Sequence, residues 1–524
     1  MLVQRLGRRH RAQLAALVCG SLLLTACTST VSGKGTAAGA GPASPTAPAV
    51  TVTPIRFNDC SSAFNLSSLT FPAGREAHLS FLCGKVAVPL SYADPTGRSI
   101  DIAMVKVHDD RNPTANDLVV NPGGPGGSGI DLAVSLSAQL AGTVLSHFDV
   151  VGFDPRGVGL SSPISCVSNT QKDALNDANP DIRTSAGFAQ AKSLAKSVAD
   201  SCTAKYGAAL ANYDTVNTAK DIDLIREGLG AKQLNYLGFS YGTELGAVYA
   251  HLFPRNVRVA VLDGAVDPLT DDITSFADQL GGFEGAFDQF ASDCLTRSDC
   301  KSLGNPRQVV YGLTRQANQT PLKSSDSAEH RTASGSIVLT GVLSALYSKS
   351  QWPALGQALI AAQGGDAKGL FALADQYNER QPDGTYSNIY DANTTISCND
   401  SKPGPTDAQV TATLSKWVNS YPMFGLWAAA SLFSCQQWQA TRAPVPLPAA
   451  ATPQKVLVIG NLHDPATPYQ GAKDLTTALG NAELLTWDGE GHTSYLQGSS
   501  CIDSDVNAYL VSGTLPPVAT TCPR

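Results

Sequence analysis

The sequence predicts an α/β fold in which a mostly parallel sheet is flanked by helices and interrupted by an inserted helical cap. Three observations lead to this prediction. Short apolar runs that end in turn residues recur along the chain, helical stretches separate most of them, and this alternation stops between residues 269 and 440. Strands that alternate with helices form parallel sheets whose two faces are both covered.

The first strands are expected to form an antiparallel hairpin, because "KVAVPLSY" and "IDIAMVKVH" flank the turn "ADPTGRS". Six further strands are predicted from the apolar runs "DLVVNPGG", "FDVVGFDPRG", "LNYLGFSYG", "VRVAVLDGAVDP", "KVLVIGNLHD" and "AELLTWDGEGH". Helices are predicted between most of them, for example over residues 218–229 and 243–253.

The cap is predicted over residues 269–440, between the sixth and seventh strands, which leaves a sheet core of residues 55–268 and 441–524. The segment has few strand-like runs and several helical ones. It also carries four of the five tryptophans: Trp352, Trp417, Trp427 and Trp438. We expect these aromatic side chains to form the core of the cap rather than to contact substrate.

The amino terminus has the composition of an export signal. Residues 1–26 combine a basic head with an apolar run that ends in small residues. The stretch "LTAC" that ends at Cys27 resembles the lipobox of bacterial lipoproteins, in which the cysteine is acylated; the alternative is simple cleavage after Ala26. Residues 27–54, rich in Thr, Ser, Gly, Ala and Pro, then form a flexible tether. We therefore expect an extracytoplasmic protein, either a lipoprotein of the cell membrane or a secreted one.

Charge and cysteine content exclude some functions. The net charge is −7 and no Lys/Arg block suggests a nucleic-acid groove, so no nucleic-acid partner is expected. Ten cysteines remain after Cys19 and Cys27, an even number typical of disulfides outside the cytosol. Pairing sequence neighbours would join 60–83, 166–202, 294–300, 398–435 and 501–522, although sequence alone does not fix connectivity. No cysteine has metal-like spacing, and we expect no metal and no cofactor.

Ser240 is the candidate nucleophile, because it lies in the frame Gly238-x-Ser-x-Gly242. A nucleophile elbow needs a strand, a tight turn with flanking glycines, and a helix that points its amino terminus at the serine. The residues on either side supply all three. The alternative is an ordinary serine in a glycine-rich turn.

Backbone donors for an oxyanion are predicted in "NPGGPGGSG", residues 121–129, which follows a strand. We assign the donors to the amides of Gly124 and Tyr241. The alternatives are an ordinary glycine-rich loop or a phosphate cradle, but the lysine and Ser/Thr of a P-loop are missing.

The general base and its orienting acid are predicted near the carboxyl terminus. Only His463 and His492 follow the cap, and His492 lies in the loop after the last strand-like run. Asp464, after the preceding strand, is the preferred acid. Asp263 and Asp267, after the sixth strand, compete with it.

Together these motifs resemble the α/β-hydrolase peptidases with a tripeptidyl-aminopeptidase-like carboxyl-terminal domain, in the prolyl-aminopeptidase group of actinobacterial secreted enzymes. The resemblance spans roughly residues 83–522 and rests on "NPGGPGGSG", "FDVVGFDPRGVGLSS", "LGFSYGTELGAVYA", "VLDGAVDP", "ISCND", "HDPATP" and "GHTSY". It implies the α/β-hydrolase fold, the triad Ser240, Asp464 and His492, and an oxyanion hole lined by "PGGPGG". Glu244 departs from the uncharged residue that such proteins often carry at this place.

The resulting expectation is an exported serine hydrolase, an aminopeptidase that releases short peptides of the tripeptidyl type from free amino termini. Its partners would be a peptide or protein substrate and the membrane, through the lipid anchor. Glu244 and Asp400 are candidates for binding the substrate ammonium; alternatively, Glu244 favours its helix terminus and Asp400 caps a turn. The rival functions are a cell-envelope carboxylesterase or lipase with the same triad, and a lipid-anchored binding protein without catalysis.

Overall fold

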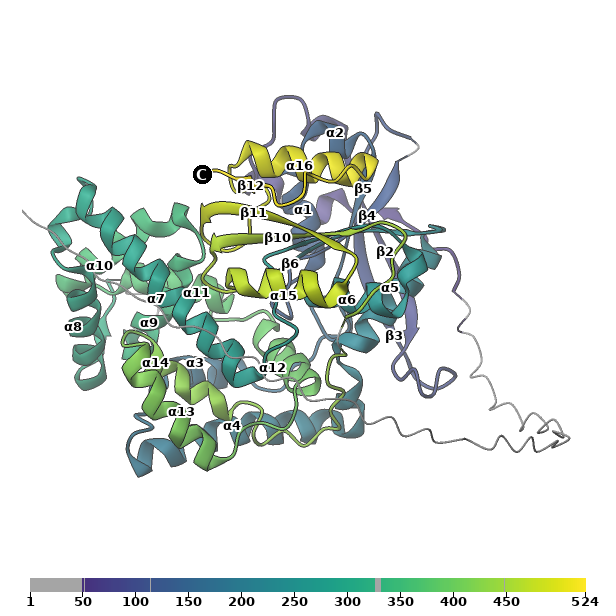
Figure 1. Cartoon of the computed structure of the whole chain (residues 1–524). Helices are drawn as coiled ribbons and strands as arrows, with labels where there is room; N and C mark the ends of the chain where they lie inside the picture. Colours follow the sequence, from purple (N-terminus) through teal and green to yellow (C-terminus); the bar gives the residue numbers. More distant parts are fainter. Residues whose placement is uncertain (1–49, 51, 114, 326–330, 447) are drawn as a thin grey trace, which may run out of the picture. The chain divides into compact units, whose positions relative to one another are not determined.

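A ten-stranded sheet runs through the computed structural model, which describes residues 50–524 except 51, 114, 326–330 and 447 (Figure 1). The strand order is β1-β2-β3-β5-β4-β6-β7-β10-β11-β12. The strands are β1 Asn58–Asp59, β2 Leu79–Pro89, β3 Ser99–Asp109, β4 Asn116–Asn121, β5 Phe148–Phe153, β6 Leu234–Phe239, β7 Val257–Asp263, β10 Val456–His463, β11 Ala482–Glu490 and β12 Thr521–Cys522. β2 and β3 form the antiparallel hairpin that the sequence predicts, and β4 to β7, β10 and β11 pair in parallel, so the fold is that of an α/β hydrolase.

Helices cover both faces of this sheet because successive side chains of each strand point to opposite sides. Val120 and its neighbours on one face pack against α1 (Gly129–Gln139), α2 (Gly142–Leu145) and α16 (Ser500–Ser512). On the other face, Val119 and its neighbours pack against α5 (Thr215–Gly228), α6 (Tyr241–Leu252) and α15 (Tyr469–Leu479) (Figure 1). The continuous apolar strands of the sequence are therefore buried on both sides.

The chain between β7 and β10 is mainly helical, as the sequence predicts. It contains α7 Asp272–Thr296, α8 Pro306–Gln319, α9 Gly335–Leu346, α10 Trp352–Gln363, α11 Lys368–Asn378, α12 Ile389–Asp400, α13 Asp407–Ser420, α14 Gly425–Ala428 and the short ribbon of β8 (Leu322–Lys323) and β9 (Thr332–Ala333). Its side chains form a hydrophobic cluster of their own, which includes Trp352 and Trp417. Trp438 is buried in the cluster of the sheet instead, and Trp427 is half-buried.

A second helical segment, between β5 and β6, contacts the insertion although the sequence assigns it to the core. It holds α3 (Asn169–Asp177) and α4 (Ser185–Tyr206), and Ala191 of α4 belongs to the hydrophobic cluster of the insertion. The insertion also contacts α3, because Asp391 of α12 forms a buried ion pair with Lys172 of α3, at 2.7 Å. Residues 169–206, which the sequence assigns to the core, thus pack partly on the insertion and partly on the sheet, and the division at 268 and 440 stays a prediction.

Five disulfides join the ten cysteines in the pattern expected for sequence neighbours. The pairs are Cys60–Cys83, Cys166–Cys202, Cys294–Cys300, Cys398–Cys435 and Cys501–Cys522. A membrane span would need a long apolar helix, and the described part of the chain contains none. The export signal, Cys27 and nearly all of the tether lie outside the described residues.

Candidate active site

Ser240 occupies a sharp turn between β6 and α6. Its φ of 55° lies in the left-handed region, where a non-glycine residue is strained by about 1–3 kcal/mol. The flanking glycines are required by close contacts: a Cβ on Gly238 would lie 2.3 Å from the carbonyl oxygen of Gly242, and one on Gly242 would lie 2.8 Å from that of Asn121. The local geometry is that of a nucleophile elbow.

The glycine-rich loop after β4 packs directly against this elbow. Gly123 has φ +95°, and a Cβ there would lie 2.5 Å from the carbonyl oxygen of Phe239. Its amide donates to the Asn121 side chain at 3.0 Å. Among the residues that the structure describes, the amides of Gly124 and Tyr241 have no hydrogen-bond acceptor. Both are therefore available to an incoming oxyanion.

Asp464, the residue directly after β10, is hydrogen-bonded to His492. Its two carboxylate oxygens lie 2.9 and 3.0 Å from Nδ1 of His492. The carboxylate also accepts the backbone amides of Ala466, Thr467 and Thr493, at 2.8 to 2.9 Å. Burial lowers the pKa of His492, but the charge and hydrogen bond of Asp464, with the charge of Asp263, outweigh it and raise that pKa. A neutral Nδ1–H donor is the tautomer that leaves Nε2 free to act as a base.

The other acid and base candidates make no hydrogen bond to His492 among the contacts of the described residues. Asp267 accepts the amide of Leu269 at 2.7 Å, and His463 contacts Arg524 through Nε2, at 3.0 Å. Asp263 lies behind the loop that carries His492 but makes no hydrogen bond to the imidazole among the contacts of the described residues. Asp464 is the carboxylate that bonds to His492.

Ser240 and His492 both lie beside the turn that follows β7. The amide of Ser240 donates to the carbonyl of Asp263 at 2.9 Å. The next residue, Gly264, has φ +70°, and a Cβ there would lie 3.3 Å from Cε1 of His492. The backbone of the elbow therefore bonds to Asp263, and the imidazole lies close to Gly264, the next residue of the turn. Among the hydrogen bonds of the described residues, none joins the hydroxyl of Ser240 to the imidazole.

Tyr347, in the insertion, also holds His492 and was not predicted. Its carbonyl accepts the amide of His492 at 2.7 Å, and its ring lies edge-on to the imidazole with a centroid separation of 5.5 Å. Beside it, Ser348 and Gly491 form an isolated antiparallel bridge. The insertion thus takes part in placing the base. No signal in "SALYS" distinguishes this tyrosine from a residue of the helical core.

Glu244 and Asp400 lie close to each other beside the elbow. Burial and the charge of Asp272 raise the pKa of Glu244 to about 7, and burial and the charge of Glu244 raise the pKa of Asp400 well above its usual value. Asp400 accepts the amide and the hydroxyl of Thr215, at 3.0 and 2.7 Å, which is the capping contact of the alternative interpretation. The Thr215 hydroxyl also bonds to the hydroxyl of Tyr241. Asp400 and the elbow therefore share one hydrogen-bonded chain, and Glu244 acts on Asp400 through its charge.

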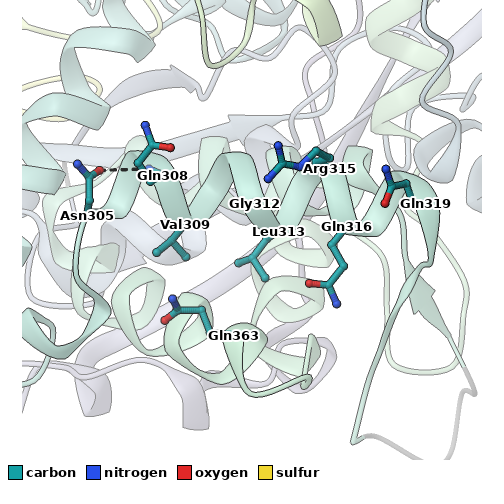
Figure 2. Close-up of a pocket in the computed structure, with 9 residues that line it drawn as sticks. All are labelled: Asn305, Gln308, Val309, Gly312, Leu313, Arg315, Gln316, Gln319 and Gln363. Carbon is teal, nitrogen blue, oxygen red and sulfur yellow. Dashed lines mark hydrogen bonds between the residues drawn. The ribbon is translucent and has the colours of Figure 1, made fainter.

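Two other features lie apart from this arrangement. A hollow of about 600 Å³ runs along α8 and is lined by Asn305, Gln308, Gln316, Gln363 and five neighbours, none from the elbow or the base loop (Figure 2). Among the described residues, the cluster that could offer metal ligands is Cys501, Asp505 and Cys522, and its cysteines are joined in a disulfide. That cluster therefore has no thiolate to offer a metal.

Known proteins resemble this chain over most of its length. It is 37% identical over 466 residues to serine protease Hip1 of Mycobacterium tuberculosis, an alignment that covers 84% of this chain and 87% of that one. It is 36% identical over 454 residues to carboxylesterase B of the same species, with 84% and 86% covered. It is 31% identical over 482 residues to tripeptidyl aminopeptidase of Streptomyces coelicolor, with 89% and 86% covered. A family model described as TAP-like protein matches residues 421–522, which include Asp464 and His492.

Proposed function

The chain belongs to the TAP-like family of α/β hydrolases and is a serine hydrolase, and we propose that it is an aminopeptidase releasing short, tripeptidyl-type peptides from free amino termini. The observation that carries this proposal is the position of Glu244 and Asp400. These two carboxylates lie beside Tyr241, the residue that follows the elbow serine.

In the proposed reaction, Ser240 attacks the substrate carbonyl while Nε2 of His492 takes its proton. Asp464 keeps the imidazole in the required tautomer and stabilises the imidazolium. The amides of Gly124 and Tyr241 donate to the oxyanion, and each such donor contributes ~3 kcal/mol to the transition state. His492 then gives its proton to the leaving amine, and water hydrolyses the acyl-enzyme.

The acidic pair supports an aminopeptidase because a substrate ammonium needs anionic partners when it is buried. No cation is among the groups of the described residues that act most strongly on the pKa of Glu244 or of Asp400. Their mutual repulsion is a cost to the free enzyme, and a bound ammonium would relieve it. A fixed distance between this pair and Ser240 would set the length of the released peptide.

The second candidate function is an esterase. Carboxylesterase B is the name of a relative at 36% identity, and the same triad chemistry hydrolyses esters. An ester substrate has no ammonium, so this function gives the acidic pair no role in binding.

Covalent labelling tests the proposed nucleophile. A fluorophosphonate phosphorylates an activated serine, so the wild-type enzyme should be labelled and Ser240→Ala should not be. Peptide mapping of the labelled protein should find the adduct on Ser240. If the alanine variant were labelled as strongly as wild type, Ser240 would not be the nucleophile.

For location, we propose export followed by acylation of Cys27. The lipobox-like "LTAC" and the five disulfides support this, because disulfides persist mainly outside the cytosol. The tether of residues 27–54 would then hold the enzyme away from the membrane surface.

Cys27→Ala should release active enzyme into the culture medium. Each methylene of an acyl chain contributes ~0.8 kcal/mol to membrane binding, so two chains anchor a protein stably and none leaves it free. Cell fractionation followed by an activity assay measures the shift from membrane to medium. Wild-type enzyme that is already free in the medium, with an unmodified amino terminus, would contradict the anchor.

A further inference from the structure

Asp263 lies at the centre of the site but has no part in the triad described above. It is the last residue of β7 and is fully buried. Its Cα partners are Phe239 on β6 and Ile459 on β10. The residue therefore lies between the strand that leads to Ser240 and the strand that leads to Asp464.

The backbone and the side chain of Asp263 each accept hydrogen bonds from a segment that carries a residue of the proposed triad. Its backbone carbonyl accepts the amide of Ser240 at 2.9 Å. Its carboxylate oxygen Oδ2 accepts the amides of Ser494 and Tyr495, at 3.0 and 2.8 Å, in the loop that carries His492. One residue thus connects the nucleophile elbow to the loop of the base.

Among the described residues, the imidazole of His492 is the cationic group that acts most strongly on this carboxylate. Its Oδ1 atom has no hydrogen-bond partner among the described residues. The titratable groups that act on it are Asp464, from the end of β10, and His492, from the loop after β11; Tyr347 packs on the imidazole from the insertion. Burial, together with the charge of Asp464, raises the pKa of Asp263 to about 6, against the opposing effects of the Tyr495 and Ser494 amides and of the His492 charge. In return, the charge of Asp263 raises the pKa of His492.

We propose that Asp263 is a positioning residue that fixes the His492 loop against the Ser240 elbow and adds a second negative charge that stabilises the protonated imidazole. This inference rests on the proposed triad. The proton passes from Oγ of Ser240 to Nε2 of His492, and Asp263 remains ionised and takes no proton. Asp464 orients the ring by direct contact, whereas Asp263 acts through the backbone of the loop and through its charge.

The variant Asp263→Asn tests the role of the charge, because its side-chain oxygen can still accept two amides. Loss of the negative charge should lower the pKa of His492 by up to about one unit, which moves the acid limb of the pH profile to lower pH. A weaker base also lowers the plateau rate, by up to about tenfold. The rates of wild type and variant should become equal at acid pH, where Asp263 is itself protonated.

The measurement is the second-order rate of fluorophosphonate labelling against pH, on the full chain, with thermal unfolding as a check of folding. Asp488→Asn is the control: it removes an exposed carboxylate from β11, where Asp488 pairs with Arg524, and should leave the profile unchanged. Asp263→Ser, smaller and also neutral, should give the same shift if the asparagine does not fit.

The outcomes separate this inference from the proposed triad. A uniform loss of rate at every pH, or a profile that coincides with wild type, would overturn the role of the charge. Wild-type enzyme that does not label, or that labels elsewhere than Ser240, would overturn the triad and this inference with it.

Discussion

His492→Ala is expected to lower kcat by ~10⁴- to 10⁶-fold, because the residues of a triad act as a unit and removal of one disables the others. Without the imidazole, no group accepts the Ser240 proton, and Asp464 is left as a buried carboxylate without its partner. Steady-state hydrolysis of an activated ester and of a peptide, at a pH on the plateau of the wild-type profile, measures the loss. KM should change little, since the imidazole acts in the transition state.

His463→Ala is the matched control. His463 precedes Asp464 in the chain, but its ring faces Arg524 and lies 3.4 Å from Asp488. This variant should keep the activity of wild type. A loss as large as that of His492→Ala, or a His492→Ala enzyme within tenfold of wild type, would contradict the assignment of the base.

Much of the fold could be predicted from the sequence because it depends on local patterns. Parallel strands are buried on both faces, so they appear as uninterrupted apolar runs, and their order along the chain alternates with helices. The hairpin of β2 and β3 and the place of the insertion follow from such short-range signals, whereas the cysteine pairing agrees with the neighbour pattern without being fixed by it. The short edge strands β1 and β12 have two residues each and carry no such signal.

The site was predictable where a motif has a stereochemical cause. Gly238 and Gly242 are needed because a side chain would collide with the backbone at the elbow, and that need is visible in the sequence. The contribution of Tyr347 depends on where α9 ends relative to the His492 loop, which no local pattern specifies. Asp272, which raises the pKa of Glu244, was missed for the same reason.

The second large effect concerns the free amino terminus of the substrate. Acetylation of a peptide substrate is expected to lower kcat/KM by ~10²-fold or more, because it removes a charge that two half-buried carboxylates would bind. Asp400→Asn should cause a similar loss on free peptides and none on acetylated peptides or short-chain esters. The asparagine can still accept the amide of Thr215, so the capping interpretation predicts no change on any substrate. Asp407→Asn, which alters an exposed carboxylate paired with Lys192, is the control and should leave all rates unchanged.

The aminopeptidase proposal also predicts the direction in which kcat/KM changes with pH. Glu244 has a pKa of about 7 and is charged only above it, so kcat/KM for free-amino peptides should fall as the pH drops through 7. Ester hydrolysis reports His492 without this contribution, so its acid limb should be less steep. In Glu244→Gln, which lacks this titrating group, the acid limb for free-amino peptides should become less steep and move toward that of the esters. Profiles that already coincide in the wild-type enzyme, together with equal cleavage of acetylated peptides, would exclude the aminopeptidase and favour the esterase, because only the aminopeptidase requires these carboxylates to be charged.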